Sequence, residues 1–310
     1  MTYHPLGSTG LQVSALGYGA SPLGSVFRSI DESEGIRTVH TAIDLGINFI
    51  DVSPYYGLTR AETVLGKALR DIPRDSFYLA TKVGRYGADE FDFSAQRVTA
   101  SIDESLRRLQ VDTIDILQCH DIEFGSVDQV IAETLPALEA LRSQGKIRFI
   151  GITGYPLKIF REVLDQVKVD TILSYCRYSL NDTSLETLIP YLQGKGVGII
   201  SASPLSMGLL TERGAPEWHP AADGVKKACA EAARHCRSQG VDLAQLAMQF
   251  ALSNNAIATT LVGTASSENL QKNVEWSQSP PDPRLLAEVQ AILQPVQNTT
   301  WASGRPENND

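Results

Sequence analysis

Short apolar runs alternate with helical patterns along most of the chain. Eight runs have the length and apolar content of buried strands, at residues 15–20, 47–52, 77–83, 113–119, 147–152, 171–175, 197–202 and 257–262. Segments between them repeat apolar residues at helical spacing, as at 35–46, 95–109, 128–145 and 157–167. Alternating strands and helices predict parallel strands joined by helices that cover the sheet. Eight such units predict a closed (β/α)8 TIM barrel, an α/β fold.

Three segments lie outside this repeating pattern. They are an N-terminal β-hairpin at 3–6 and 11–15, an extra C-terminal helical region at 284–295 and a polar tail at 297–310. The tail has little apolar surface to bury and is expected to fray. We interpret residues 1–310 as a single barrel domain with a core over about 4–295.

An open, doubly wound sheet is the competing architecture. Its first strand usually leads into a G-x-G-x-x-G turn. Residues 17–24 read GYGASPLG, in which the glycines have a different spacing, so the closed barrel is favoured. After the seventh strand, the loop at 203–224 is rich in Gly and Pro, and its length is typical of a functional segment.

Composition and charge narrow the class of partner. The 310 residues are 43% hydrophobic and 20% charged, and the formal net charge is −9. Nucleic acids and anionic membranes are also negative, so an acidic surface disfavours both. No basic stretch followed by an apolar run opens the chain, and no run approaches the ~18 apolar residues of a membrane span. We expect a cytoplasmic protein, a monomer or weak dimer, that acts on a small molecule.

The cysteines give no sign of a disulfide framework or a metal site. The chain has four of them, Cys119, Cys176, Cys229 and Cys236, without a C-x-x-C pair. They are expected to be reduced, packed thiols. Cys119, His120 and Asp121 place three ligand types side by side, but adjacent residues of a strand point to opposite faces. We therefore expect no metal.

Four ionisable residues fall where the predicted strands end, at Asp51, Tyr56, Lys82 and His120. Each alone has an ordinary structural explanation, but active sites of this fold form where these strand ends meet. A lysine ammonium near a tyrosine favours the phenolate and lowers its pKa, and Lys82 needs a carboxylate partner such as Asp51. His120 could orient a substrate oxygen. The set predicts proton transfer to or from an alcohol oxygen.

These residues resemble the aldo-keto reductase superfamily, over about residues 4–280. The matching motifs are Asp51 with Tyr56-Gly57, Glu62 and Leu65-Gly66, then 80-ATKVG-84, 105-SLRRLQVDTIDILQCH-120, 145-GKIRFIGIT-153 and 201-SASPLSMGLL-210. The resemblance places Tyr56 on the catalytic position, with Asp51, Lys82 and His120 beside it. Tyr55 is one residue off that position and is expected to line the pocket.

Within the superfamily, the chain is most similar to the plant-type L-galactose dehydrogenases and related aldose 1-dehydrogenases. Stretches such as 51-DVSPYYG-57, 118-QCHDIEFGS-126 and 173-LSYCRYSLND-182 carry this similarity. It implies oxidation of L-galactose at C1 to a galactonolactone with a nicotinamide cofactor. The substrate residues it suggests are Phe27, Tyr55, Tyr86, Asp121, Phe124 and Trp218.

The resemblance also suggests cofactor contacts, at Thr153, Tyr175, Ser203, Leu205, Gly208, Gly263, Thr264, Asn269 and Asn273. Two of these depart from the common pattern: Ser-Asn is replaced by Thr153-Gly154, and a Gln by Tyr175. Members that prefer NADP carry a cationic clamp for its 2′-phosphate after the last strand, where this chain has Asn269 in place of the arginine. Without that clamp we expect NAD rather than NADP.

Three other functions remain open at this point. An apolar pocket separates similar sugars weakly, so L-fucose or D-arabinose could be the preferred aldose. A general aldehyde reductase would use the same residues. The fold also serves non-catalytic, cofactor-binding regulatory subunits, because a fold does not fix a function.

Overall fold

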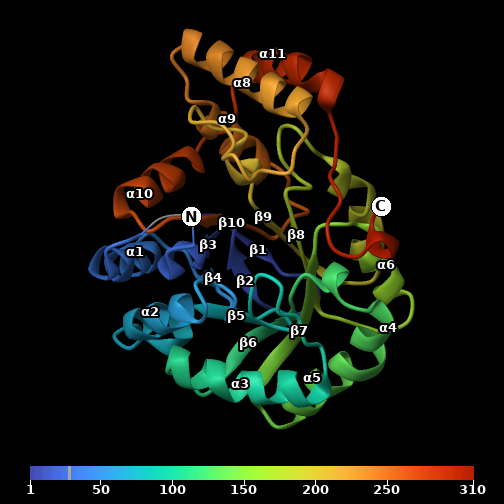
Figure 1. Ribbon diagram of the computed structural model, residues 1–310. Helices are drawn as coiled ribbons and strands as arrows, with labels where there is room; N and C mark the ends of the chain where they lie inside the picture. Colours follow the sequence, from blue (N-terminus) through green and yellow to red (C-terminus); the bar gives the residue numbers. More distant parts are fainter. Residues whose placement is uncertain (27–28) are drawn as a thin grey trace.

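The predicted barrel is confirmed by the computed structural model, which describes residues 1–26 and 29–310 (Figure 1). Eight parallel strands close in the order β10-β3-β4-β5-β6-β7-β8-β9. Their bounds are β3 (Leu16–Gly19), β4 (Phe49–Asp51), β5 (Tyr78–Val83), β6 (Ile114–Cys119), β7 (Ile147–Gly154), β8 (Thr171–Tyr175), β9 (Gly198–Ala202) and β10 (Thr259–Gly263). Each strand coincides with or overlaps one of the eight apolar runs, because the helices outside the barrel and the side chains inside it bury both faces of the strand.

The predicted N-terminal hairpin is present, formed by β1 (Tyr3–Pro5) and β2 (Gln12–Ser14). Its apolar residues Leu6, Leu11 and Val13 are buried in one cluster with barrel-lining residues such as Phe49. Gly7 packs so closely on the start of β9 that a Cβ there would lie 2.3 Å from the Gly198 nitrogen. Because β9 begins at Gly198, the hairpin closes the N-terminal end of the barrel.

Helices surround the barrel (Figure 1). They are α1 (Glu32–Asp44), α2 (Arg60–Leu69), α3 (Ala95–Leu109), α4 (Val127–Gln129), α5 (Leu135–Ser143), α6 (Lys158–Leu164), α7 (Ile189–Gly194), α8 (Asp223–Ser238), α9 (Leu243–Leu252), α10 (Ser267–Trp276) and α11 (Pro283–Leu293). Side-chain caps begin several of them, as where the Ser94 hydroxyl accepts a hydrogen bond from the Arg97 N–H. The predicted extra C-terminal helix is α11, which packs against α8.

The helical pattern at 128–145 forms one interrupted helix. A five-residue π-helical segment, η4 (Val130–Thr134), connects α4 to α5. Pro136 lies in the first turn of α5. Proline has no N–H to donate and its ring crowds the preceding turn, so a wider turn before it relieves the clash.

The expectation that residues 297–310 fray is wrong. Trp301 stacks on the ring of Tyr155, with centroids 4.6 Å apart. Asn308 is only 4% exposed, and its Nδ2 donates to the backbone oxygen of Glu123 at 2.8 Å. This tail is held by directional hydrogen bonds and one aromatic stack rather than by a broad apolar face, which is why its polar composition was misleading.

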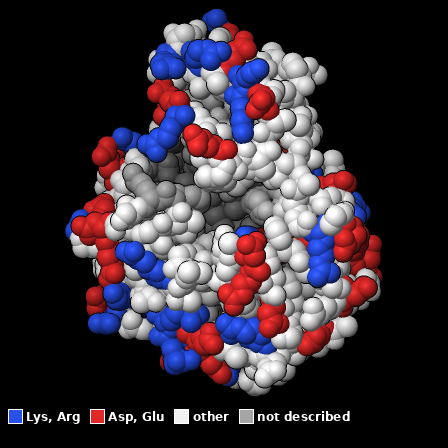
Figure 2. Space-filling model, in the orientation of Figure 1, with Lys and Arg blue, Asp and Glu red and all other residues white. Residues whose placement is uncertain are grey.

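The remaining features agree with a packed, reduced protein. All four cysteines are free and buried. Within the described residues, no helix has the length and apolar character needed to cross a bilayer. The face seen in Figure 2 is hollowed near its middle, with acidic and basic side chains interspersed around the hollow.

Candidate active site

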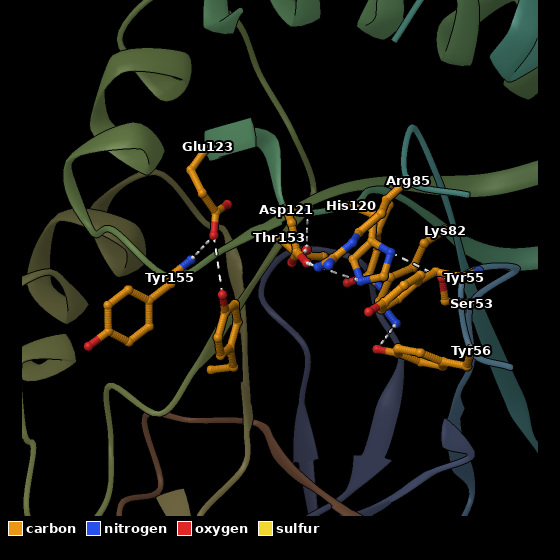
Figure 3. A network of polar contacts seen from close by, with 12 residues as sticks. Ser53, Tyr55, Tyr56, Lys82, Arg85, His120, Asp121, Glu123, Thr153 and Tyr155 are labelled. Atoms are coloured by element: carbon orange, nitrogen blue, oxygen red, sulfur yellow. Dashed lines mark hydrogen bonds and ion pairs between the residues drawn. The ribbon is translucent and has the colours of Figure 1, made fainter. Parts of the chain in front are cut away.

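The four candidate catalytic residues come from the C-terminal ends of neighbouring strands. Asp51 is the last residue of β4, Lys82 is the penultimate residue of β5, and His120 directly follows β6. β5 pairs with both β4 and β6, so the three side chains share one part of the rim. The loop between β4 and α2 supplies Tyr56, whose hydroxyl faces Lys82 in Figure 3.

The Lys82 ammonium is buried, and all three of its N–H groups have acceptors. It donates to Asp51 Oδ1, to the Val52 backbone oxygen at 2.9 Å and to the Tyr56 hydroxyl oxygen at 3.4 Å. Burial lowers the pKa of Lys82, but Asp51 and Tyr56 together raise it above its ordinary value. Lys82 is therefore charged at neutral pH. Because Lys82 donates to the Tyr56 oxygen, the Tyr56 proton is free to point elsewhere.

The structure corrects the expected pKa of Tyr56. Burial raises this pKa to about 12, and the opposing effect of Lys82 is smaller. Lys82 acts in the expected direction, yet the net shift is upward because the phenolate would lose its hydration. The Tyr56 hydroxyl is thus protonated at neutral pH in this state of the protein.

His120 is a neutral imidazole beside Tyr56. Burial lowers the pKa of His120 to about 3, although Asp121 opposes this effect. The ring meets the Tyr56 ring edge-on, with centroids 5.7 Å apart. Its Nδ1 lies 3.0 Å from the Ser53 hydroxyl oxygen, and its Nε2 lies 3.7 Å from Asp121 Oδ2. Neutral histidine can act as a hydrogen-bond donor or acceptor but adds no charge.

Several residues that the sequence analysis missed support these groups. Gln118 of β6 is the register partner of Lys82 on the adjacent strand β5, and it donates from Nε2 to Asp51 Oδ2 at 2.8 Å. Arg85 donates to Asp121 Oδ2 at 2.6 Å. Burial alone would raise the pKa of Asp121, but His120 and Arg85 hold it below its ordinary value. Gln118 could have been found from its position, since it lies two residues before His120 and so points to the same side of β6.

The Asp121 carboxylate also ties down Thr153. The Thr153 hydroxyl accepts from the Asp121 N–H at 2.8 Å and donates to Asp121 Oδ1 at 3.1 Å. Its only proton is therefore used within the protein, and Thr153 is fully buried. With Arg85 on the other oxygen, Asp121 is engaged on both sides, as Figure 3 shows.

The candidate substrate residues are placed differently from one another. Arg85 lies over the ring of Tyr55 at 4.0 Å and over that of Phe124 at 5.2 Å, so one face of each ring is covered by a cation. Tyr86 lies against α3, with Arg97 3.9 Å from its ring centroid. Of the candidate catalytic residues, none is in a recorded contact with Tyr86 within the described part of the chain.

Trp218 and Phe27 are the other two candidate substrate residues. Trp218 is 59% exposed in the loop after β9 and stacks on His219. His219 in turn contacts Trp301 of the tail edge-on, so this loop and the tail lie side by side. Phe27 lies outside the described residues.

The segment after β9 has the backbone expected of a phosphate-binding loop. Ser203, Ser206, Met207 and Gly208 all have positive φ, a conformation that non-glycine residues adopt rarely. Repeated left-handed residues concentrate where function requires them, and such turns can gather N–H groups on one side. Leu205 lies within the same segment and is partly exposed. The Ser206 and Gly208 N–H groups already donate to the Ser203 and Leu205 oxygens, so the binding of a pyrophosphate at this segment stays a prediction.

The end of β10 and the start of α10 form the other expected cofactor contact. Gly263 is exposed, and a Cβ there would lie 3.2 Å from the Pro22 ring. The Thr264 hydroxyl accepts from the Ser266 N–H at 3.2 Å. Asn269 is exposed, and Asn273 is buried on the same helix.

A carboxylate that the sequence analysis missed lies at the N-terminus of α10. Glu34 of α1 accepts from the Ser267 N–H at 3.1 Å. This bond and the Arg37 side chain hold the pKa of Glu34 below its ordinary value, so it is charged. Arg37 is committed to the same carboxylate through a 2.5 Å ion pair. An anion at this helix end would meet a site that Glu34 already occupies.

Tyr175 ends β8 beside a second buried carboxyl. Its hydroxyl donates to Glu123 Oε1 at 3.3 Å. Burial raises the pKa of Glu123 to about 8, and Asp121 adds to this rise. Ser303 of the tail donates to the same oxygen at 3.1 Å, which places the tail directly beside this candidate cofactor residue. Figure 3 shows Glu123 to one side of His120 and Lys82.

Comparison with known proteins agrees with this geometry. Residues 15–294 match the aldo/keto reductase family. The chain is 55% identical to L-galactose dehydrogenase from Arabidopsis thaliana, over 98% of both chains. It is 33% identical to D-arabinose 1-dehydrogenase from Saccharomyces cerevisiae, over 89% of this chain and 90% of that one. D-threo-aldose 1-dehydrogenase from a Pseudomonas species is 32% identical, over 87% of this chain and 91% of that one.

A solved structure of an aldo-keto reductase is similar to this one over the whole chain. The holo form of aldo-keto reductase AKR11C1 from Bacillus halodurans superposes with a TM-score of 0.79 at 29% identity, and the match covers 100% of both chains.

Proposed function

The chain belongs to the aldo/keto reductase family and is an oxidoreductase; on that premise, we propose that it oxidises L-galactose at C1 to L-galactono-lactone with NAD. The observation that carries the proposal is the contact between Tyr56 and the buried Lys82–Asp51 pair, with His120 beside it. The 55% identity to a plant L-galactose dehydrogenase, over nearly the whole of both chains, supports the choice of sugar.

In this proposal Tyr56 moves the proton. A bound oxidised nicotinamide would supply the acceptor for the hydride of C1, so that the sugar would lose one hydride and one hydroxyl proton, with NADH and a proton as products. Tyr56 takes the proton from the C1 hydroxyl, for which it must first be a phenolate. Lys82 stabilises that phenolate by donating to its oxygen. His120 donates to the sugar oxygen and fixes its distance from Tyr56.

Glu34 supports the proposed preference for NAD over NADP. A 2′-phosphate near the N-terminus of α10 would approach the Glu34 carboxylate, which already accepts a hydrogen bond there. The nearby cation Arg37 pairs with Glu34, and the exposed Asn269 offers no charge. Desolvating a dianionic phosphate at this place would therefore bring little return.

A related aldose is the second candidate. The matches named for D-arabinose and D-threo-aldoses align over most of this chain at 32–33% identity. A pocket that differs by one contact separates such sugars by only about 10- to 200-fold in kcat/KM. The choice between them depends on a few contacts around Tyr55 and Phe124.

A matched pair of variants tests the chemistry. Tyr56→Phe removes the proposed base, and Tyr55→Phe makes the same change one residue away. We expect Tyr56→Phe to lower kcat by roughly 10²- to 10⁴-fold, with the Kd for NAD nearly unchanged. Tyr55→Phe should keep most of kcat, because its ring still lies against Arg85. Normal turnover by the Tyr56→Phe protein would contradict the proposed mechanism.

A substrate panel tests the sugar and the cofactor. Initial rates of nicotinamide reduction are measured with L-galactose, L-fucose and D-arabinose, each with NAD or NADP at matched concentrations. The proposal expects the highest kcat/KM for L-galactose with NAD. A higher value for another aldose would keep the chemistry and replace the sugar. Equal rates with NADP would show that a cation reaches the 2′-phosphate.

A further inference from the structure

Whether His120 can donate a hydrogen bond to a substrate depends on which ring nitrogen carries its proton. Its pKa is lowered, first by burial, so the ring is neutral and holds one N–H. Nδ1 faces the Ser53 hydroxyl, and Nε2 lies on the side of the Asp121 carboxylate. Only the tautomer with the proton on Nε2 leaves a donor on the side away from Ser53.

The Ser53 side chain has one hydroxyl proton to donate and is fully buried. Its oxygen accepts the Tyr55 N–H at 3.1 Å, which fixes the side chain in the turn after β4. If Nδ1 carried the His120 proton, it would donate to Ser53. The Ser53 proton would then have no acceptor within the described part of the chain. If Nε2 carries the His120 proton, the Ser53 hydroxyl donates to Nδ1 at 3.0 Å, and the Nε2 proton is left on the side of Asp121.

Asp121 favours the same tautomer. Its Oδ2 lies 3.7 Å from Nε2. A carboxylate attracts an N–H and repels an imidazole lone pair, so a proton on Nε2 is electrostatically favoured. Leaving a buried hydroxyl without an acceptor shifts a two-state ratio by roughly 5- to 150-fold, and this effect adds to that of Asp121.

We propose that Ser53 is a positioning residue that holds His120 in the Nε2–H tautomer, which makes His120 a hydrogen-bond donor to the substrate oxygen. The part about substrate rests on the proposed function, whereas the tautomer is a property of the protein alone. Figure 3 shows Ser53 and Tyr55 beside the His120 ring.

His219 provides an internal reference for the measurement. Its Nδ1 accepts the Ala221 N–H at 3.1 Å, and its Nε2 lies 3.0 Å from the Ser206 backbone oxygen. A carbonyl can only accept, so Nε2 of His219 must carry the proton. This assignment does not involve Ser53.

The first test is NMR of protein labelled with ¹⁵N-histidine, using long-range ¹H–¹⁵N correlations at pH 7. The His120 signals are assigned by their loss in His120→Asn. We expect the pattern of an Nε2–H imidazole for both His120 and His219 at pH 7, and for His120 no change between pH 5 and pH 9. An Nδ1–H pattern for His120, or a charged ring at pH 7, would overturn the proposal.

The second test asks whether the Ser53 hydroxyl is responsible. Ser53→Thr keeps a hydroxyl, and Ser53→Val has nearly the same shape without one. We expect the Val protein, and also Ser53→Ala, to show a measurable Nδ1–H population and a kcat for L-galactose lowered roughly 3- to 10-fold. The Thr protein should restore the native pattern. The tautomer and kcat of the native protein persisting in both Val and Ala would refute the role of Ser53.

The two tests separate this inference from the proposed function. An Nε2–H pattern in a protein that does not oxidise L-galactose would leave the inference standing and refute the sugar. An Nδ1–H pattern in an active enzyme would do the reverse. If Ser53→Ala does not fold, the native spectrum and the Thr and Val pair still decide the matter.

Discussion

The buried Glu123 carboxyl is expected to make the protein less stable as the pH rises. Burial raises its pKa to about 8 from an ordinary value of 4.5. The folded protein therefore keeps this proton between those two pH values, while the unfolded chain has lost it. The contribution of Glu123 to stability is fully present below about pH 4.5 and falls by about 1.4 kcal/mol per pH unit until about pH 8. The interval corresponds to at most about 5 kcal/mol.

Glu123→Gln removes the titration and keeps the shape. The amide oxygen can still accept from Ser303 and Tyr175, as Glu123 Oε1 does now. The change in unfolding free energy, variant minus native, should be small near pH 5 and rise to about 4–5 kcal/mol at pH 8.5. With about 2.1 cal/mol/K of unfolding entropy per residue, that difference corresponds to a Tm gain of roughly 7 °C.

The assay is urea unfolding at half-unit pH steps, followed by tryptophan fluorescence. Trp301 reports on the tail, because it stacks on Tyr155. Glu307→Gln is the control, because it makes the same substitution in the same tail at a site whose side chain is 66% exposed and leaves the Glu123 carboxyl in place. A constant difference between Glu123→Gln and native across the range would refute the reasoning, since any fixed effect of the amide cancels in the slope.

Four further predictions concern the active site and the tail. Burial raises the pKa of Tyr56 to about 12, so L-galactose oxidation at sub-saturating sugar should speed up nearly tenfold per pH unit between pH 7 and 9, measured in initial rates. Lys82→Met leaves the Asp partner of Lys82 buried without a counter-ion and should lower the unfolding free energy in urea by about 3–5 kcal/mol. Asn269→Arg combined with Glu34→Gln should tighten the Kd for NADP at least about tenfold and change that for NAD about twofold or less, by fluorescence titration. A Cβ at Gly154 would lie 2.8 Å from a Glu carboxyl oxygen, so Gly154→Ala should speed hydrogen exchange in the tail.

The fold could be predicted because its evidence is periodic. Each of the eight strands lies within an apolar run or overlaps it by several residues, and helix α3 matches the predicted segment at both ends. The candidate catalytic residues could be expected to lie together because strand ends converge in this fold, and the structure does bring them together. Both arguments use patterns that extend over several residues, the apolar periodicity and the motif spacing, and a single sequence is enough to show such patterns.

The features that could not be predicted depend on the relative size of opposing pKa shifts or on the direction in which one side chain points. The pKa of Tyr56 rises because burial outweighs the effect of Lys82, and a sequence does not contain the depth of a side chain. Tyr86 lies beside Arg97 of α3 while Arg85 pairs with Asp121, and the sequence of an irregular loop does not show which way each side chain points. The tail binds through a few hydrogen bonds to Glu123, which composition cannot reveal.

One departure from the wider superfamily now has a physical reason. Where many members have an asparagine, this chain has Gly154, and a Cβ there would press on both Glu123 Oε2 and Ile159. The missing side chain leaves the space in which the Glu123 carboxyl lies. That carboxyl accepts from Tyr175 and from Ser303, and the backbone oxygen of Glu123 accepts from Asn308. The space left at Gly154 thus holds the carboxyl on which the tail docks, so we expect the tail and the Tyr175 side of the site to respond together when Gly154 is changed.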